Sequence, residues 1–123
     1  MDRERFKTLV ATALDNLPEE FHRRLDNIVV VVGDRPSKSQ LTRLGMSPGM
    51  TLLGLYEGVP LPRRGTGYAM VLPDKITIFQ QAVEGICRDE RQIPGEIERV
   101  LKHEIAHHFG ISDARLKEIE RER

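Results

Sequence analysis

The stretch HEIAHHFGISD, residues 103–113, contains the side chains whose types and spacing are best suited to chemistry. His103 and His107 are four residues apart, so on a helix they lie about 40° apart around the axis and one turn apart along it. Two imidazoles in this arrangement can bind one metal ion. Glu104 follows His103 by about 100° of helix rotation, so we expect it beside the ion rather than bound to it. From there its carboxylate can take a proton from a water molecule that the metal activates and deliver it to a leaving group.

Two histidines leave a tetrahedral zinc ion short of protein ligands, because catalytic zinc sites use three protein ligands and one water. Asp113 is the candidate for the third ligand, but on a continuous helix it would lie more than two turns from His103. Gly110 stands between them, and glycine reaches positive φ without a steric penalty, so the helix can end there. We therefore predict a zinc (Zn2+) site of His103, His107 and Asp113, with Gly110 as the structural turn. These ligand types do not distinguish zinc from manganese, iron or cobalt.

The motif is more specific than a pair of histidines alone. From approximate residue frequencies, H-E-x-x-H arises by chance in about 0.3% of chains of this length, and requiring the glycine and the aspartate lowers this to about one in 10⁵. The alternative is a polar helix whose histidines coincide by chance. His108 falls beside the apolar face of the same helix, so we expect a packed histidine rather than a ligand.

The segment that carries the motif has the apolar periodicity of a helix, and helices are also predicted at several other places. Residues 94–109 place an apolar stripe opposite the two histidines, and this stripe would anchor the helix in a core. The stripe consists of Ile97, Leu101, Ile105 and Phe109. Residues 2–16 form another amphipathic segment, for which Asp2 is the predicted N-cap. Shorter helices are predicted after Pro18, after the capping pair Ser37 and Gln40, over residues 81–90, and after the capping residue Ser112.

Strands are predicted between these helices. Residues 28–32 are a continuous β-branched run, which indicates a strand buried on both faces near the centre of a sheet. Residues 51–56, 68–72 and 75–80 are the other predicted strands, separated by turn-rich segments. The order of helix, strands and then helices predicts an α+β fold with a small mixed β-sheet of about four strands. We expect residues 1–123 to form a single domain.

Composition limits the classes of partner. The 19 Lys and Arg residues balance the 19 Asp and Glu residues, so the net charge is zero, which argues against a nucleic-acid partner. The chain contains no run of the ~20 apolar residues that a membrane span needs, and its first residues are not typical of a signal peptide. Cys87 is the one cysteine, which excludes an intrachain disulfide and suits a reducing compartment. We expect a cytoplasmic protein that acts away from membranes; its oligomeric state does not follow from the sequence.

Several segments together resemble one protein family. HEIAHHFGISD follows the pattern H-E-x-x-H-x-x-G-x-x-D, the aspartate-ending variant of the metzincin signature. Together with VVVVGDRPS, TLLGLYEGVPL and VLPDKITIFQ, it resembles the small bacterial minimal zincins, predicted zinc metallopeptidases, over roughly residues 25–120. The resemblance implies a zincin-like fold, with the active-site helix near the C-terminus, and zinc held by His103, His107 and Asp113. It also implies that Glu104 is the catalytic general base and acid.

The resemblance also implies where a peptide or protein substrate would bind. In zincins an edge strand of the sheet lines the cleft and pairs with extended substrate, and here that strand would be residues 76–80. Metzincins have a methionine turn after the zinc helix, but the ten residues after Asp113 contain no methionine, so we expect the floor of the site to come from upstream. Tyr56 and Tyr68 are candidate donors to the substrate oxyanion. The substrate-binding residues expected on the strand are Ile76, Thr77, Ile78 and Phe79.

These inferences predict a zinc-dependent hydrolase, specifically a metallopeptidase. Two alternatives stay open. Other small zinc hydrolases cleave RNA, but they use three histidines, and the aspartate and the neutral charge weigh against that substrate. A structural zinc site in a non-enzymatic binding module usually has four protein ligands, often cysteines, whereas this motif offers three.

Overall fold

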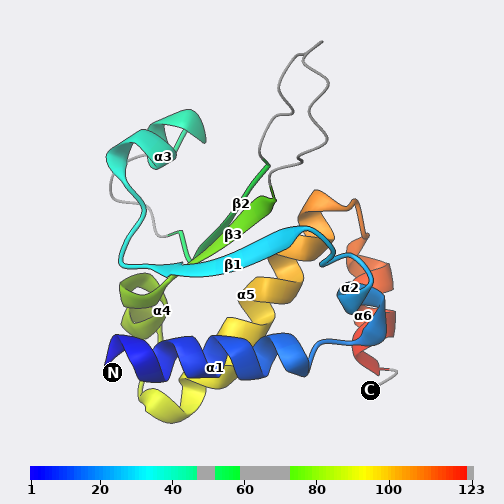
Figure 1. Ribbon diagram of the computed structural model, residues 1–123, viewed down its shortest axis with the longest axis horizontal. Helices are drawn as coiled ribbons and strands as arrows, with labels where there is room; N and C mark the ends of the chain where they lie inside the picture. The colour runs from blue at the N-terminus through cyan, green and yellow to red at the C-terminus, as the bar shows by residue number, and fades with distance from the viewer. Residues whose placement is uncertain (47–51, 59–72, 122–123) are drawn as a thin grey trace.

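The computed structural model describes residues 1–46, 52–58 and 73–121, and for Asp113 and Glu120 it describes the backbone alone. Within these ranges, helices surround a small sheet (Figure 1). The helices are α1 (Arg3–Asp15), α2 (Glu19–His22), α3 (Lys38–Arg43), α4 (Gln80–Ile86), the 3₁₀ turn η1 (Glu90–Gln92), α5 (Ile93–His108) and α6 (Asp113–Arg121). The strands are β1 (Ile28–Gly33), β2 (Gly54–Glu57) and β3 (Asp74–Phe79).

The sheet has the strand order β1-β3-β2 and is mixed. β1 and β3 run parallel, in a register that pairs Ile28 with Asp74, whereas β2 and β3 run antiparallel, with Gly54 opposite Ile78. The expected α+β fold is confirmed, but the described residues contain three strands rather than about four. The predicted strand at residues 68–72, and with it Tyr68, lies outside the described residues.

The strand predicted to be central is at an edge of this sheet. β1 pairs with β3 alone among the described strands, and the side chains of Val29 and Val31 are 42% and 39% exposed. The strand that is buried on both faces is β3, because Ile76 and Ile78 face the main core while Phe79 packs in a second apolar cluster. A β-branched run indicates a strand but not its position in the sheet, which depends on pairing partners elsewhere in the chain.

The same strand order corrects the predicted substrate edge. Residues 76–79 belong to β3, which is hydrogen-bonded to a strand on each side and therefore has no open edge within the described sheet. Their side chains are core residues, since Ile76, Thr77, Ile78 and Phe79 are at most 6% exposed. The edge that lies against the motif helix belongs to β2, which contacts α5 directly.

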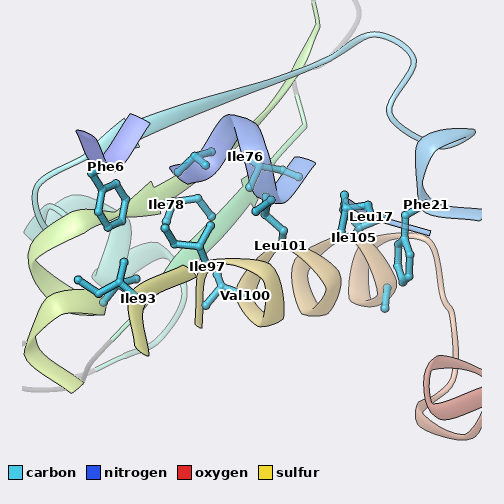
Figure 2. Packing of buried hydrophobic residues seen from close by; sticks show 14 of the residues in the cluster. Phe6, Leu17, Phe21, Ile76, Ile78, Ile93, Ile97, Val100, Leu101 and Ile105 are labelled. Carbon is cyan, nitrogen blue, oxygen red and sulfur yellow. The ribbon is translucent and has the colours of Figure 1, made fainter. Parts of the chain in front are cut away.

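The main core lies between the sheet and the helices α1 and α5, which both pack on one face of the sheet (Figure 1). One buried cluster in this layer contains Phe6 of α1, Ile76 and Ile78 of β3 and the buried residues of α5 (Figure 2). The predicted stripe is largely confirmed, because Ile97, Leu101 and Ile105 are fully buried, as Figure 2 shows for all three. Phe109 is 39% exposed instead, because α5 has ended by that position.

Local capping signals place the ends of the helices. The Asp2 side chain accepts a hydrogen bond from the Arg5 backbone N–H at 2.8 Å, as expected of an N-cap. Ser37 and Gln40 form a complete capping box at the start of α3. No helix in the described part of the chain is both long and apolar enough to cross a membrane.

Candidate functional site

Helix α5 presents His103 and His107 on one exposed face. Its opposite face is buried through Ile97, Leu101 and Ile105, so the histidines are directed outward by the same periodicity that anchors the helix. Their ring centroids are 6.4 Å apart, and the ring planes meet at 57°. The two imidazoles are therefore neighbours on one turn of a helix that the core holds in place.

The donor pair suits one zinc ion. A zinc–nitrogen bond of about 2.0–2.1 Å places a ring centroid roughly 3.2 Å from the ion, so two rings at a tetrahedral angle lie about 5.2 Å apart. The observed 6.4 Å exceeds this by an amount that small rotations of two exposed side chains can close. His103 and His107 can thus reach the same ion without movement of the backbone.

A zinc site on these two histidines would need a third ligand from beyond α5. No group of three His, Cys, Asp or Glu side chains within the described residues is close enough to hold a metal ion. The side chain of Asp113 is outside that description, but its backbone is described, and Asp113 is the first residue of α6. The geometry of the turn between α5 and α6 therefore bears directly on the predicted ligand set.

The turn follows from Gly110 and Ser112. Gly110 has a φ of +71°, a left-handed conformation that favours glycine, and the Ile111 N–H donates to the Ala106 carbonyl at 2.8 Å. These features form the Schellman motif that commonly ends helices. The Ser112 side chain then accepts a hydrogen bond from the Arg115 N–H at 3.0 Å and caps α6. A new helix begins at Asp113, so this residue does not continue the axis of α5.

Helix α6 is held against α2 at the end of the molecule where both lie side by side (Figure 1). Arg115 forms an ion pair with Glu20 of α2, with a nitrogen–oxygen distance of 2.6 Å. Ile119 of α6 is buried in the main core and is 1% exposed. The position of the Asp113 backbone therefore depends on packing and charge contacts with the N-terminal part of the chain.

Glu104 lies next to His103 on α5 and is half-buried against β2. Its Oε1 atom accepts a hydrogen bond from the Tyr56 backbone N–H at 3.1 Å. Burial raises the pKa of the Glu104 carboxyl above its usual value, and the Tyr56 N–H and the two histidines oppose that rise. A carboxyl group with a raised pKa is suited to accept and return a proton during catalysis.

Gly54 allows β2 to lie this close to α5, and sequence reasoning did not single it out. A Cβ atom at Gly54 would lie 2.6 Å from Val100 Cγ1 and 3.5 Å from Glu104 Cγ. With any other residue type, the Val100 side chain, the strand or the helix would therefore have to shift. The available signal was a glycine inside a predicted strand, which often marks a close approach of another segment.

Tyr56, a predicted oxyanion donor, has its hydroxyl engaged elsewhere. The hydroxyl donates to Asp74 Oδ2 at 2.7 Å, and the ring stacks on His108 with centroids 3.7 Å apart. Burial, followed by the hydrogen bond and charge of Asp74, raises the pKa of Tyr56. His108 therefore packs on an aromatic ring, as expected of a histidine outside the ligand set, although its side chain is exposed.

Two cavities meet at Glu104. The larger, of about 380 Å³, reaches His107, and the smaller, of about 250 Å³, reaches His103. Both are bordered by Leu52, Gly54 and Glu104. The carboxyl group of Glu104 therefore lies between two cavities, beside two histidines and the edge of β2.

Comparisons with known proteins found a matching family model and a similar solved structure. The family model described as zincin-like metallopeptidase matches residues 25–123. Among solved structures, a conserved hypothetical protein of T. thermophilus is 23% identical, with a TM-score of 0.61, and the match covers 89% of this chain and 94% of that chain. At this level of identity the similarity establishes the fold alone. No curated protein matches the chain significantly.

Proposed function

Because the chain belongs to the family of zincin-like metallopeptidases, we propose that it is a zinc-dependent hydrolase that cleaves peptide bonds. The observation that carries the proposal is the position of Glu104, half-buried at the junction of two cavities and beside the pair of exposed histidines, His103 and His107. We also propose a cytoplasmic location and a peptide or protein substrate, as expected from the sequence.

In this proposal the ion is bound by His103, His107 and Asp113, and Glu104 acts as the general base and acid. When bound, zinc supplies a Lewis acid that polarises the scissile carbonyl and lowers the pKa of a water molecule. Glu104 accepts a proton from the attacking water and returns it to the leaving amine. The Tyr56 N–H engages Oε1 of Glu104, which orients the carboxylate and leaves Oε2 for the proton.

The edge of β2 is the proposed binding surface for the substrate main chain, in place of residues 76–79. The Phe79 N–H donates to the Leu53 carbonyl at 2.9 Å, and hydrogen-bonded pairs alternate along an antiparallel ladder. The backbone groups of Gly54 and Tyr56 therefore point away from β3, which agrees with the contact between Tyr56 and Glu104. Because the Tyr56 N–H already donates to Glu104, an extended peptide would pair with the other main-chain groups of this edge, without requiring a particular sequence.

The direct test is cleavage of a peptide library by the zinc-loaded protein, followed by mass spectrometry. The matched control is Glu104→Gln, which keeps the size of the side chain and removes its ability to take a proton. We expect the wild type to cleave and the variant to be slower by about 10²- to 10⁴-fold. Equal cleavage by both proteins would remove Glu104 from the mechanism, and no cleavage by the zinc-loaded wild type would contradict the proposed function.

A further inference from the structure

Three successive turns of α5 contact β2. Val100, Glu104 and His108 are spaced by four residues, so each lies one turn beyond the one before it. A Cβ atom at Gly54 would meet Val100 Cγ1 at 2.6 Å. The Tyr56 N–H donates to Glu104 Oε1 at 3.1 Å, and the Tyr56 ring stacks on His108. The hydrogen bond to Glu104 is therefore flanked on both sides by contacts between the same helix and the same strand.

The Tyr56 side chain is held at its ring and at its hydroxyl. The ring plane lies within 11° of the His108 ring plane, with centroids 3.7 Å apart, and the ring meets Phe109 edge to face at 6.2 Å. The hydroxyl donates to Asp74 Oδ2 at 2.7 Å. A hydrogen bond to an ionised carboxylate is about twice as strong as one between neutral groups. The side chain is therefore fixed between the end of α5 and the start of β3.

Asp74 is well placed to anchor a neighbouring strand. It is the first residue of β3, and its N–H donates to the Asn27 carbonyl at 3.1 Å, just before β1 begins. In contrast, β2 is four residues long and pairs with β3 alone among the described strands. The bond between Tyr56 and Asp74 therefore gives this short strand a second attachment to β3, through the same residue whose N–H contacts Glu104.

We propose that Tyr56 and Asp74 are positioning residues for Glu104. The contacts of the Tyr56 side chain with Asp74 and His108 fix the Tyr56 main chain, and its N–H in turn fixes the Glu104 carboxylate. The inference rests on the proposed peptidase function, in which Oε2 of Glu104 takes the proton. It adds two residues that lie outside the HEIAHHFGISD motif and act without touching the substrate.

The orientation of Glu104 should affect the rate more than substrate binding. A hydrogen bond weakens steeply once its angle falls below about 120°, so a small movement of β2 would release the carboxylate. Misplacement of a catalytic group by about 1 Å can slow a reaction by about 100-fold. An interaction that matters only in the transition state lowers kcat and leaves KM unchanged. Simple loosening of β2, which is the proposed substrate edge, would raise KM instead.

Hydrogen exchange at the amide of residue 56, followed by NMR in the zinc-free protein, measures the contact itself. Glu104→Ala removes the acceptor and gives the rate expected when the bond is absent. We expect Asp74→Ala and Tyr56→Phe to accelerate this exchange by about tenfold. Asp74→Asn keeps a carbonyl oxygen for the hydroxyl, so it should stay within about threefold of the wild type. Amides of β1 and β3 in the same spectra show whether the sheet is intact.

Asp2→Ala is the matched control for Asp74→Ala. It also removes a carboxylate that accepts one hydrogen bond, at 2.8 Å from the Arg5 N–H, but at the N-cap of α1. It destabilises the fold through the loss of that cap and should leave exchange at residue 56 unchanged. Wild-type exchange rates in Asp74→Ala and Tyr56→Phe would overturn the proposal, and so would equal acceleration in Asp2→Ala.

Kinetics of the zinc-loaded protein test the consequence for catalysis. On a peptide that the wild type cleaves, kcat should fall about tenfold in Asp74→Ala and Tyr56→Phe, while KM changes by less than about twofold. Asp2→Ala should keep the wild-type kcat. A raised KM with unchanged kcat would overturn the positioning role. Absence of cleavage by the wild type contradicts the proposed function instead, and the exchange rates, which need neither zinc nor activity, still decide whether Asp74 and Tyr56 set the contact with Glu104.

Discussion

The backbone N–H of Tyr56 donates to Oε1 of Glu104 over 3.1 Å and joins two residues that are 48 positions apart in the chain. This contact links the edge strand β2 to the motif helix α5. It explains how a carboxyl group next to two exposed histidines is itself half-buried and held in one orientation. Substitutions in β2 should therefore affect the site as well as substitutions in the motif.

Gly54 should be intolerant of any side chain. In Gly54→Ala the new methyl group would meet Val100 Cγ1 at 2.6 Å, and overpacking of this kind destabilises by about 1–3 kcal/mol. Urea denaturation measures the change in the free energy of unfolding. Gly95→Ala is the control, because a Cβ there meets no other atom within 4 Å and alanine is the better helix former, by up to about 1 kcal/mol.

A double variant isolates the contact between Gly54 and Val100. Adding Val100→Ala to Gly54→Ala removes the Cγ1 atom that the new methyl group meets. We expect a favourable coupling energy of at least about 0.5 kcal/mol in the double-mutant cycle. Strictly additive effects would mean that the strand and the helix are not in close contact at this point.

The pKa of Tyr56 should be higher than that of an ordinary tyrosine. The chain has two tyrosines and no tryptophan, so Tyr68→Phe leaves Tyr56 as the sole phenol. The ionisation of Tyr56 can then be followed by near-ultraviolet absorbance. Burial and Asp74 raise its pKa above the ordinary value of 10.0, and Asp74→Asn should bring it closer to that value. A midpoint at or below 10.0 in the Tyr68→Phe protein would contradict the buried hydrogen bond.

The sign of the accompanying stability change follows from the raised pKa. The neutral phenol of Tyr56 is favoured in the folded state, so its contribution to stability is complete below the unfolded-state pKa near 10.0. That contribution is lost as the pH rises from there through the folded-state pKa. Thermal melts of the Tyr68→Phe protein above about pH 10 should therefore fall with pH more steeply than those of a protein that also carries Tyr56→Phe.

Zinc affinity should depend on His103, His107 and Asp113. Replacing any one of them with alanine is expected to weaken binding by about 100-fold or more, since loss of an outer partner alone weakens it by about 10- to 100-fold. Competition with a chromophoric chelator gives the dissociation constants. His22→Ala is the control and should bind zinc like the wild type. Unchanged affinity in Asp113→Ala would remove this residue from the ligand set.

The ion pair between Glu20 and Arg115 should influence zinc binding from a distance. Glu20→Gln weakens the contact that holds α6 to α2, and α6 begins at the predicted ligand Asp113. Because both side chains are partly exposed, we expect a loss of zinc affinity of about two- to fivefold. The matched control is Glu4→Gln, which removes an exposed pair with Lys7 within α1. Equal affinities in the two variants would show that the pair does not position α6.

Several features of this protein could be predicted from the sequence because their causes are local. The Asp2 cap, the capping box at Ser37, the left-handed turn at Gly110 and the cap at Ser112 each depend on a few consecutive residues. The α+β class followed from the order of periodic segments, and the match to the zincin-like metallopeptidase family agrees with the motif. The pair of histidines on one face of α5 followed from helix geometry alone.

Only the tertiary structure decided the order of the strands and what lies beside the motif. β1 was expected at the centre and β3 at the edge, but β3 pairs with both neighbours and leaves Val29 and Val31 of β1 exposed. Side-chain alternation reports which face of a strand is apolar, and not which strand lies next to it. The contact of Tyr56 with Glu104 depends on the order of the strands and on the packing of α5 against β2, which Gly54 permits. Both involve residues far apart in the sequence, so no local pattern predicts the contact.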